Sequence, residues 1–173
     1  IECKSTFSFT RKIMEFKWIV LLKFRYINDT IEVGDFMRLE LLSYENTNLL
    51  PGWKPYFIYL IMVDHQEVGR IVLREGSSLE RYYDGHIGYS IEEEYRGHHY
   101  SREACLLLFE IAKEKGFKEL MISCSPENLA SRKIIESLPF HYVETKTVPK
   151  ELRKYFDQDD YVKRIYRLNL EEL

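Results

Sequence analysis

The segment from Ile87 to Ser101 constrains the fold most, because it passes from an apolar strand pattern through a charged turn into a strongly apolar helix pattern. A helix that starts near His99 leaves its first backbone N–H groups without intrahelical partners, and the helix dipole adds positive charge there. Such an end binds anions. Arg96 supplies a planar cation just before it, and Gly97 allows close main-chain approach to a ligand. The junction therefore predicts a phosphate-binding site.

Residues 96–101 read Arg-Gly-His-His-Tyr-Ser. This segment resembles the Arg/Gln-x-x-Gly-x-Gly/Ala signature of the GNAT superfamily of acyl-CoA-dependent N-acyltransferases, which lies between the fourth strand and third helix of that family. His99 stands where the second glycine is usual, and Ser101 where Ala or Gly is usual. From ordinary backbone preferences we expect His99 to adopt helical or extended geometry and to project its ring.

A second segment strengthens the resemblance. Residues 124–131 read Cys-Ser-Pro-Glu-Asn-Leu-Ala-Ser. They resemble the strand end and the Asn-x-x-Ser helix start of the same family, and Phe140 falls where that family has Gly-Phe. Two motifs at the right separation are more specific than either alone. The resemblance covers roughly residues 31–170.

The resemblance and the pattern agree on the fold class. Antiparallel strands come first and strand-helix-strand-helix follows, which predicts an α/β (α+β) fold with a mixed, largely antiparallel central sheet and helices on its faces. We expect two parts: residues 1–30 as an N-terminal extension that can add a strand, and residues 31–173 as a GNAT-like N-acetyltransferase domain. Alternating apolar residues from Phe16 to Tyr26 suggest that extra strand.

Individual elements follow from periodicity and turn residues. We expect a first core strand at residues 37–41, a hairpin of residues 56–63 and 67–73 around Asp64-His65-Gln66, and a strand at 86–91. A helix at 100–115 ends before Gly116, a strand follows at 119–123, and a second helix spans 128–138. Strands at 140–148 and 161–170 close the domain. Between the first strand and Tyr56 little room remains for the helix pair common in this family.

The resemblance implies binding of acetyl-CoA as the cosubstrate. The pantetheine arm would lie between splayed strands and bond to main-chain groups near Tyr89 and Ile91, and the pyrophosphate would lie at the helix start. The residues expected to hold CoA are Ile91, Arg96, Gly97, His98, His99, Tyr100, Ser101 and Asn128. Asn128 is also a good N-cap, and it can do both. His98 is either a phosphate neighbour or a solvated turn residue.

The reaction implied is direct attack of a primary amine on the acyl thioester, with a base or water chain taking the amine proton and a donor for the thiolate. Many family members place a Tyr seven residues after the Asn, but here that position is Ile135. We therefore expect Ser131 to replace it as donor, His86 to act as a base, and Tyr89 to be a third catalytic candidate. Alternatively, Ser131 takes part in the local hydrogen bond of the helix cap or faces solvent.

Histidines and cysteines also raise other chemistry. Adjacent His98 and His99 point their rings apart, which disfavours a metal site, and we expect none. The cysteines show no C-x-x-C spacing. Cys124 is better explained as a buried strand residue than as an acyl carrier, and a reducing cytoplasm is the simpler setting.

Charge and hydropathy exclude some partners. The net charge of −3 gives no basic field for nucleic acid, and the apolar run before Ile27 is interrupted by Lys17, Lys23 and Arg25. It therefore falls short of the ~20 residues that cross a membrane. The same charges argue against a signal peptide. The acidic run Glu92–Glu94 is a solvated rim or favours a cationic amine. A homodimer is compatible with the sequence.

The resulting hypothesis is an N-acetyltransferase that acts on a primary amine of a small molecule or peptide. Two alternatives remain: a GNAT-like protein that binds acyl-CoA without turnover, suggested by the substituted glycine and the missing Tyr, and a peptide or nucleotide-binding module that uses the Arg96 turn for another phosphate. The acceptor, the acyl-chain preference and the general base are not set by the sequence.

Overall fold

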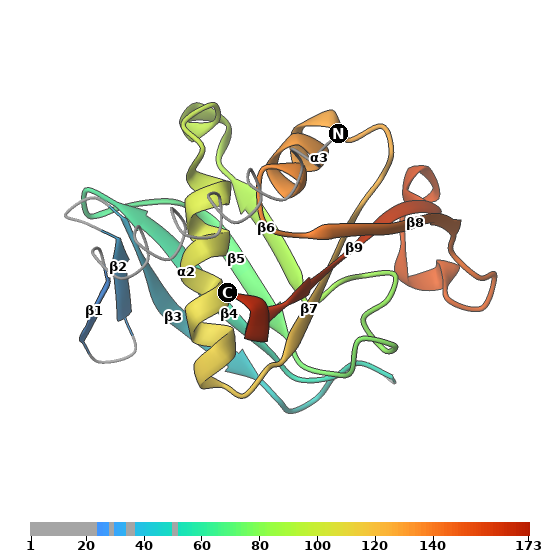
Figure 1. Cartoon of the computed structure of the whole chain (residues 1–173), viewed down its shortest axis with the longest axis horizontal. Coiled ribbons are helices and arrows are strands. Elements are labelled where there is room, and N and C mark those ends of the chain that lie inside the picture. The colour runs from blue at the N-terminus through green and yellow to red at the C-terminus, as the bar shows by residue number, and fades with distance from the viewer. Residues whose placement is uncertain (1–23, 28–29, 34–36, 50–51) are drawn as a thin grey trace, which may run out of the picture.

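A computed structural model of the chain describes residues 24–27, 30–33, 37–49 and 52–173. In this part the strands form two sheets (Figure 1). The first has the order β1-β2-β3-β4-β5-β6, with β1 Phe24–Ile27, β2 Thr30–Val33, β3 Met37–Glu45, β4 Tyr56–Val63, β5 Gln66–Arg74 and β6 Ile87–Ile91. The second has the order β7-β9-β8, with β7 Glu119–Cys124, β8 His141–Thr147 and β9 Val162–Asn169.

The helices are few. The described residues contain two α-helices, α2 Tyr100–Glu114 and α3 Leu129–Glu136, and four short 3₁₀ helices: η1 Glu93–Tyr95, η2 Arg153–Tyr155, η3 Gln158–Asp160 and η4 Leu170–Glu172. The predicted α/β class with largely antiparallel strands and helices on the sheet faces is confirmed. The strands expected in one mixed central sheet form two sheets, and each ladder between the described strands is antiparallel. The predicted 128–138 helix is shorter than expected, because Asn128 is its N-cap and Ser137 its C-cap.

The β4–β5 hairpin forms where the turn residues predicted it. Val63 pairs with Gln66, so Asp64 and His65 form the two-residue turn. Both have positive φ values, 47° and 66°. A tight hairpin turn of this kind needs two left-handed residues to match the twist of its strands, and Asp and His tolerate that region better than most side chains.

The segment between β3 and β4 contains no helix in its described residues, 46–49 and 52–55. β3 continues to Glu45, four residues beyond the predicted end, after a register shift between Leu41 and Ser43. The strand therefore takes up chain that the family's helix pair would use. The expectation that little room remains for those helices is confirmed.

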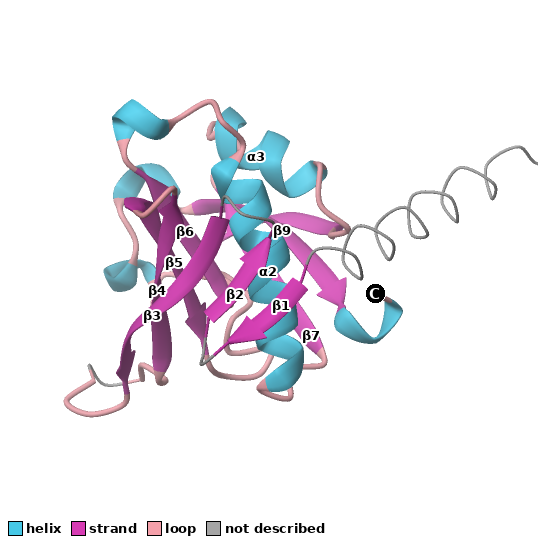
Figure 2. Cartoon of the chain, turned by 90° about the vertical axis from the view of Figure 1, so that its left-hand side faces the viewer, coloured by secondary structure: helices cyan, strands magenta, loops and turns pink. Residues whose placement is uncertain are grey.

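Helix α2 packs on one face of the first sheet, against β2, β3, β5 and β6 (Figures 1 and 2). The apolar helix pattern predicted there forms a buried stripe: Ala104, Leu107, Leu108, Ile111 and Ala112 are each at most 6% exposed. Leu106 and Phe109 are buried as well, so the helix is covered over more than one face. Gly116 follows the helix with a φ of 84°, as expected for its C′ glycine.

A gap separates β6 from β7. Helix α2 returns the chain so that both strands run in the same direction, and they diverge towards the end where α2 starts and α3 lies (Figure 1). At the other end the His86 N–H donates to the Met121 carbonyl oxygen at 2.7 Å, which joins the two sheets. β6 pairs only with β5 and β7 only with β9 among the described strands. The fold therefore holds a wedge that is closed at one end and open at the other.

The N-terminal prediction lies mostly outside the described residues. β1 pairs with β2 at the edge of the first sheet, from Phe24 opposite Val33 to Ile27 opposite Thr30. Residues 1–23 carry the rest of the predicted extra strand and are not described. The domain boundary at residue 31 stays a prediction. Within the described part of the chain, no helix has both the length and the apolar character needed to cross a membrane.

Candidate active site

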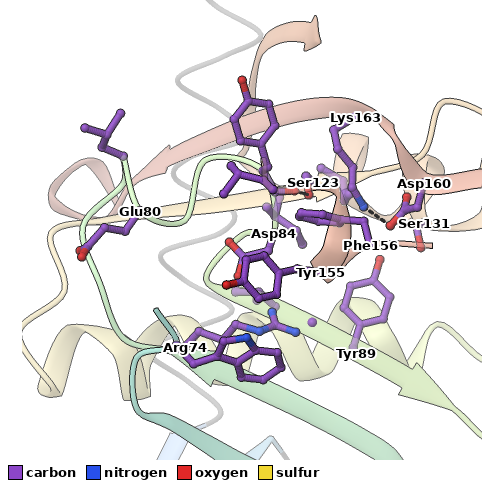
Figure 3. A pocket seen from close by; sticks show the side chains of 18 of the residues that line it. Arg74, Glu80, Asp84, Tyr89, Ser123, Ser131, Tyr155, Phe156, Asp160 and Lys163 are labelled. Carbon is purple, nitrogen blue, oxygen red and sulfur yellow. Dashed lines mark hydrogen bonds and ion pairs between the residues drawn. The ribbon is translucent and has the colours of Figure 1, made fainter. Parts of the chain in front are cut away.

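A cleft of about 460 Å³ opens beside the wedge (Figure 3). Its walls come from β5, β6, β7, α3 and the two long loops at residues 75–86 and 148–161. The predicted catalytic residues Tyr89 and Ser131 both line it, and none of the residues predicted to bind CoA does. The lining residues are Gly52, Trp53, Arg74, Leu79, Glu80, Tyr83, Asp84, Ile87, Gly88, Tyr89, Ile122, Ser123, Ser131, Ile135, Leu152, Tyr155, Phe156, Asp160 and Lys163.

The free edge of β6 presents main-chain groups to the wedge. The Glu92 N–H donates to the Val68 carbonyl, and Gly69 pairs with Ile91. In an antiparallel ladder this makes Ile91 and, by alternation, Tyr89 non-hydrogen-bonded positions whose N–H and C=O groups point away from β5. These groups therefore face the gap towards β7. The Ile91 carbonyl accepts one bond from Arg96 Nε at 3.2 Å, which leaves the Ile91 N–H for an added strand-like ligand.

The loop that enters α2 leaves its main-chain donors open. The first helical hydrogen bonds come from the N–H groups of Arg102 and Glu103, both to the His99 carbonyl. The N–H groups of residues 97–101 make no well-aligned main-chain hydrogen bond with the described residues, and His99 provides no side-chain cap. Free amides at a helix start form a site for an anion.

His99 adopts a geometry opposite to the one expected. Its φ of 64° and ψ of 13° are left-handed, so the expectation of helical or extended backbone is wrong. The loop needs a left-handed residue before α2, and this is the position where the family has glycine. Histidine is among the side chains that tolerate this region. Gly97 is also left-handed, with a φ of 87° and nothing within 4 Å of the position of a Cβ.

The other predicted loop residues lie around these amides. The rings of His98 and Tyr100 stack with centroids 5.3 Å apart, which holds His98 beside the helix start. Ser101 is only 7% exposed, which explains a small residue at this position. The exposed Arg96 is fixed by its bond to the Ile91 carbonyl, close to the free edge of β6.

Asn128 caps α3. Its Oδ1 accepts a hydrogen bond from the Ser131 N–H at 3.0 Å, so the capping interpretation is confirmed. The side chain is exposed, and its amide nitrogen has no hydrogen-bond partner among the described residues. Asn128 can therefore cap the helix with its oxygen and donate to a ligand with its nitrogen.

Tyr89 and Ser131 come together from opposite sides of the wedge. The Tyr89 hydroxyl oxygen is buried and has no well-aligned hydrogen-bond partner among the described residues. Burial raises the pKa of Tyr89, Cys105 adds to this, and the nearby Ser131 hydroxyl opposes it. Figure 3 shows the Tyr89 ring directed from β6 towards the side of the cleft where Ser131 lies. A buried hydroxyl without a well-aligned partner in the described protein leaves a hydrogen bond available to a ligand.

His86 is a structural residue in this geometry. Its side chain is 1% exposed, Nδ1 accepts a hydrogen bond from the Met121 N–H at 2.8 Å, and Nε2 lies 3.0 Å from the Gly76 carbonyl. The Nε2 nitrogen must then carry the proton, because Nδ1 accepts. Burial lowers the pKa of His86. The expected role as base is therefore corrected: no ring nitrogen is free to take a substrate proton.

Arg74 is a cleft residue that the sequence did not predict, whereas Cys124 and the histidines were considered for other chemistry. Arg74 ends β5 and lines the cleft, but the strand pattern stops at Leu73 and nothing in the sequence marks its neighbour as a site residue. Burial raises the pKa of Cys124, which is 5% exposed, and this disfavours a thiolate acyl carrier. The described residues contain no cluster of three or more His, Cys, Asp or Glu that can hold a metal ion.

Comparison with known families identifies the domain. Residues 24–141 match the family of acetyltransferase (GNAT) domains. The chain belongs to the GNAT acetyltransferase family. A comparison with curated protein sequences finds no significant match.

Solved structures of GNAT proteins share the fold. A structure described as a probable acetyltransferase matches with a TM-score of 0.61 and 18% identity, over 83% of this chain and 98% of the other. RimL, described as a ribosomal L7/L12 alpha-N-protein acetyltransferase in complex with coenzyme A, matches with a TM-score of 0.54 and 17% identity. This match covers 68% of this chain and 64% of the RimL chain. The microcin C7 self-immunity acetyltransferase MccE, solved with acetyl-CoA and AMP, matches with a TM-score of 0.53 and 17% identity. This match covers 66% of this chain and 61% of the MccE chain.

The coverage sets the scope of these likenesses. The match spans slightly less than two thirds of the RimL chain and of the MccE chain.

In the GNAT motif of this chain, Ile135 occupies the position seven residues after Asn128, and it is buried in the lining of the cleft. The site that many family members fill with a Tyr hydroxyl is therefore apolar here, beside the hydroxyls of Tyr89 and Ser131.

Proposed function

We propose that the protein is an N-acetyltransferase that transfers the acetyl group of acetyl-CoA to a primary amine by direct attack. The open row of N–H groups at residues 97–101, at the end of the wedge between β6 and β7, carries this proposal. A polyanion fits there because these donors are preorganised and the helix dipole adds positive charge. The membership of the GNAT family makes acetyl-CoA the polyanion expected.

Each part of acetyl-CoA has a corresponding element. The pyrophosphate would contact the amides of the loop, with Arg96, His98 and His99 beside them. The pantetheine arm would bond the N–H of Ile91 and the main chain of Tyr89 along the free edge of β6, and the amide nitrogen of Asn128 from the other side. Solved RimL and MccE structures contain CoA and acetyl-CoA, which supports a CoA site in this fold.

The cleft would hold the acceptor. The neutral amine attacks the thioester carbonyl carbon, the C–S bond breaks, and the amine proton leaves through solvent because His86 has no free nitrogen. The leaving thiolate then takes a proton from the hydroxyl of Tyr89 or Ser131, and solvent restores that proton. The Tyr89 hydroxyl is protonated near neutral pH and can donate this proton, but its raised pKa makes it a weaker acid than an ordinary tyrosine.

A second candidate is an acyl-CoA-binding protein without turnover. The apolar Ile135 in the cleft favours it, because the hydroxyl that many family members use is missing at that position. Both candidates predict CoA binding and differ only in acetyl transfer.

Two measurements test the proposal. Calorimetry with acetyl-CoA, CoA, desulfo-CoA and ATP is expected to show binding of the CoA compounds and weaker binding of ATP, because only the former have a pantetheine arm. A free-thiol assay with a panel of amines then detects turnover. Binding without thiol release for any amine supports the second candidate, and equal binding of ATP supports a nucleotide-binding module.

Two further expectations belong to this proposal. The free thiols of Cys105 and Cys124 are both buried, which is compatible with a reducing cytoplasm as the setting. A homodimer stays a prediction, and light scattering on the full chain at several concentrations tests it.

A further inference from the structure

One cation that lines the cleft has no ion-pair partner among the described residues. Its ionisable acidic and basic residues are Arg74, Glu80, Asp84, Asp160 and Lys163. Asp160 and Lys163 pair with each other. Glu80 pairs with Lys54 at 3.1 Å, and Asp84 pairs with Arg81 at 2.5 Å. Arg74 forms no ion pair with any residue in the described part of the chain. Among the described lining residues, Arg74 is therefore the cation outside any ion pair, and each acidic residue is in one.

The guanidinium of Arg74 is held in place by the sheet. It lies over Gly88 of β6, where a Cβ atom would be only 2.8 Å from Nη2, so the missing side chain makes the space that the guanidinium occupies. Its one hydrogen bond within the described protein is long, 3.4 Å from Nη1 to the Gly85 carbonyl. The group is thus positioned, while most of its N–H donors are unused.

Burial makes the charged form of Arg74 less stable than it would be in water. Burial lowers the pKa of Arg74, Asp84 opposes the shift, and Arg81 adds to it. The residue still carries its charge at neutral pH, because a guanidinium is not deprotonated in proteins. A partly buried cation without a partner is costly, and a bound anion would offset that cost.

We propose that the acceptor carries an anionic group, a carboxylate or a phosphate, that pairs with Arg74 while its amine lies beside Tyr89 and Ser131. The proposal rests on the N-acetyltransferase function proposed above. Figure 3 shows Arg74, Tyr89 and Tyr155 lining the same cleft. The planar guanidinium forms paired hydrogen bonds with either anion.

The size and walls of the cleft narrow the class further. A volume of about 460 Å³ is that of a small-molecule site, and Trp53 and Tyr155 provide partly exposed aromatic walls. Polyamines and other polycations would need free carboxylates. Each acidic residue among the described lining residues is already paired. The acceptor is therefore a compact amino acid, or an aminoalkyl phosphate, in preference to a polycation.

The experiment compares matched acceptors. Serine, phenylalanine and 4-aminobutanoate are each tested against their carboxamides, and 2-aminoethyl phosphate against ethanolamine, as ligands of the CoA-bound protein by calorimetry and as substrates by thiol release. Arg74→Gln removes the charge, and Arg74→Lys keeps it without the planar fork. Arg70→Gln is the control, because Arg70 lies on the same strand β5, is exposed and pairs with Glu67 outside the cleft. Melting temperatures verify that all variants fold.

In the wild-type protein and in Arg70→Gln we expect at least one anionic acceptor to exceed its neutral counterpart by about tenfold or more in affinity and in kcat/KM. In Arg74→Gln this ratio should collapse, and Arg74→Lys should retain part of it. A preference for an amino acid over its carboxamide indicates a carboxylate as the anionic group. A preference for 2-aminoethyl phosphate over ethanolamine indicates a phosphate.

The outcomes separate this inference from the proposed function. Acetyl transfer with an unchanged anion preference in Arg74→Gln overturns the inference and keeps the function. Anion binding that depends on Arg74, without acetyl transfer to any amine, keeps the anion site and overturns the function. Absence of both anion preference and anion binding overturns the inference.

Discussion

The two ends of the wedge between β6 and β7 use the same polar groups in opposite ways. At the closed end, the His86 N–H and both ring nitrogens are engaged with the main chain of Met121 and Gly76. At the open end, the amides of residues 97–101 and the Tyr89 hydroxyl have no well-aligned hydrogen-bond partner among the described residues. Satisfied groups fix the sheets together, and unsatisfied groups form a site. The distinction between them depends on tertiary contacts and not on residue type.

The two helix starts at the open end repeat this contrast on a smaller scale. α3 is capped by Asn128, whose oxygen takes up the Ser131 N–H. α2 begins after a left-handed His99 without a side-chain cap. A capped start contributes to helix stability, whereas an uncapped start keeps its donors for a ligand. We therefore assign the phosphates to α2 and a supporting contact to α3.

The largest effect is expected from breaking the closed end. His86→Leu leaves the buried Met121 N–H and the partly exposed Gly76 carbonyl without these bonds, which should lower the free energy of unfolding by about 2 to 5 kcal/mol. Urea denaturation measures this. His98→Leu is the control, since His98 is exposed and no hydrogen bond to its ring is present in the described protein. Equal stability of His86→Leu and wild type would show that the ring does not join the sheets.

The next effect concerns the open end. Arg96→Ala should remove a charge-assisted contact of about 1.5 to 3 kcal/mol with the pyrophosphate and weaken CoA binding tenfold or more. Arg102→Ala, in the first turn of α2 and paired with Glu103, is the control and should bind CoA nearly as the wild type does. Calorimetry on folded variants gives the affinities. An unchanged CoA affinity in Arg96→Ala removes Arg96 from the site.

A smaller effect is expected from protonating His86, because the ring then loses only the bond that Met121 donates to Nδ1. Burial lowers the pKa of His86 in the folded state, whereas the unfolded state keeps a pKa of about 6.5. Below that pH the unfolded chain binds the extra proton first, so stability is complete above about pH 6.5 and falls as the pH drops further.

Wild type and His86→Gln, compared by urea denaturation between about pH 7.5 and 5, isolate this contribution. The stability difference between the two proteins should shrink as the pH falls, because the variant has no imidazole to protonate. A difference that stays constant over this range contradicts the assigned protonation state.

Sequence patterns predicted the parts of the fold that depend on neighbouring residues. The α2 stripe around Leu108, the C′ glycine Gly116 and the cap Asn128 are local features, and each was found as expected. His86 was misassigned because its partners, Met121 and Gly76, lie far along the chain. Strand alternation carries no information about such contacts.

The loop geometry and the cleft charge were missed for related reasons. The left-handed φ of His99 is imposed by the path of the loop and overrides the preference of its side chain. Arg74 becomes notable only because Gly88, from the next strand, leaves it space and no acid pairs with it. Both are properties of the assembled sheet.

Asn128 tests whether a capping residue also serves the ligand. Asn128→Ala should lower the free energy of unfolding by about 1 kcal/mol through loss of the cap, and Asn128→Asp should keep the cap. Leu129→Ala, an exposed residue of the same turn, is the stability control. If the amide nitrogen bonds the pantetheine arm, Asn128→Asp loses CoA affinity at unchanged stability. Full CoA affinity in Asn128→Asp limits the residue to capping.

The smallest effect is expected at His99, where backbone strain and ring chemistry can be separated. His99→Gly removes a left-handed penalty of about 1 to 2 kcal/mol but adds about 0.5 to 1 kcal/mol of backbone entropy, so its stability should change little. We expect this variant to keep or modestly improve CoA affinity, because the amides retain their positions. His99→Ala keeps the strained Cβ and removes only the ring.

Measuring CoA affinity of both His99 variants at several values between about pH 5.5 and 8.5 separates the two contributions, because an imidazole gains charge at the acidic end and then binds phosphate more strongly. A loss of CoA affinity in His99→Ala that grows towards acidic pH assigns a phosphate contact to the ring. An unchanged CoA affinity at every pH shows that the ring does not contribute to binding. If the wild type binds no CoA at any pH and His99→Gly gains binding, the strained loop is a degenerate form of the phosphate site. The open end of the wedge would then resemble the closed end in being structural only, and the contrast between them would be lost.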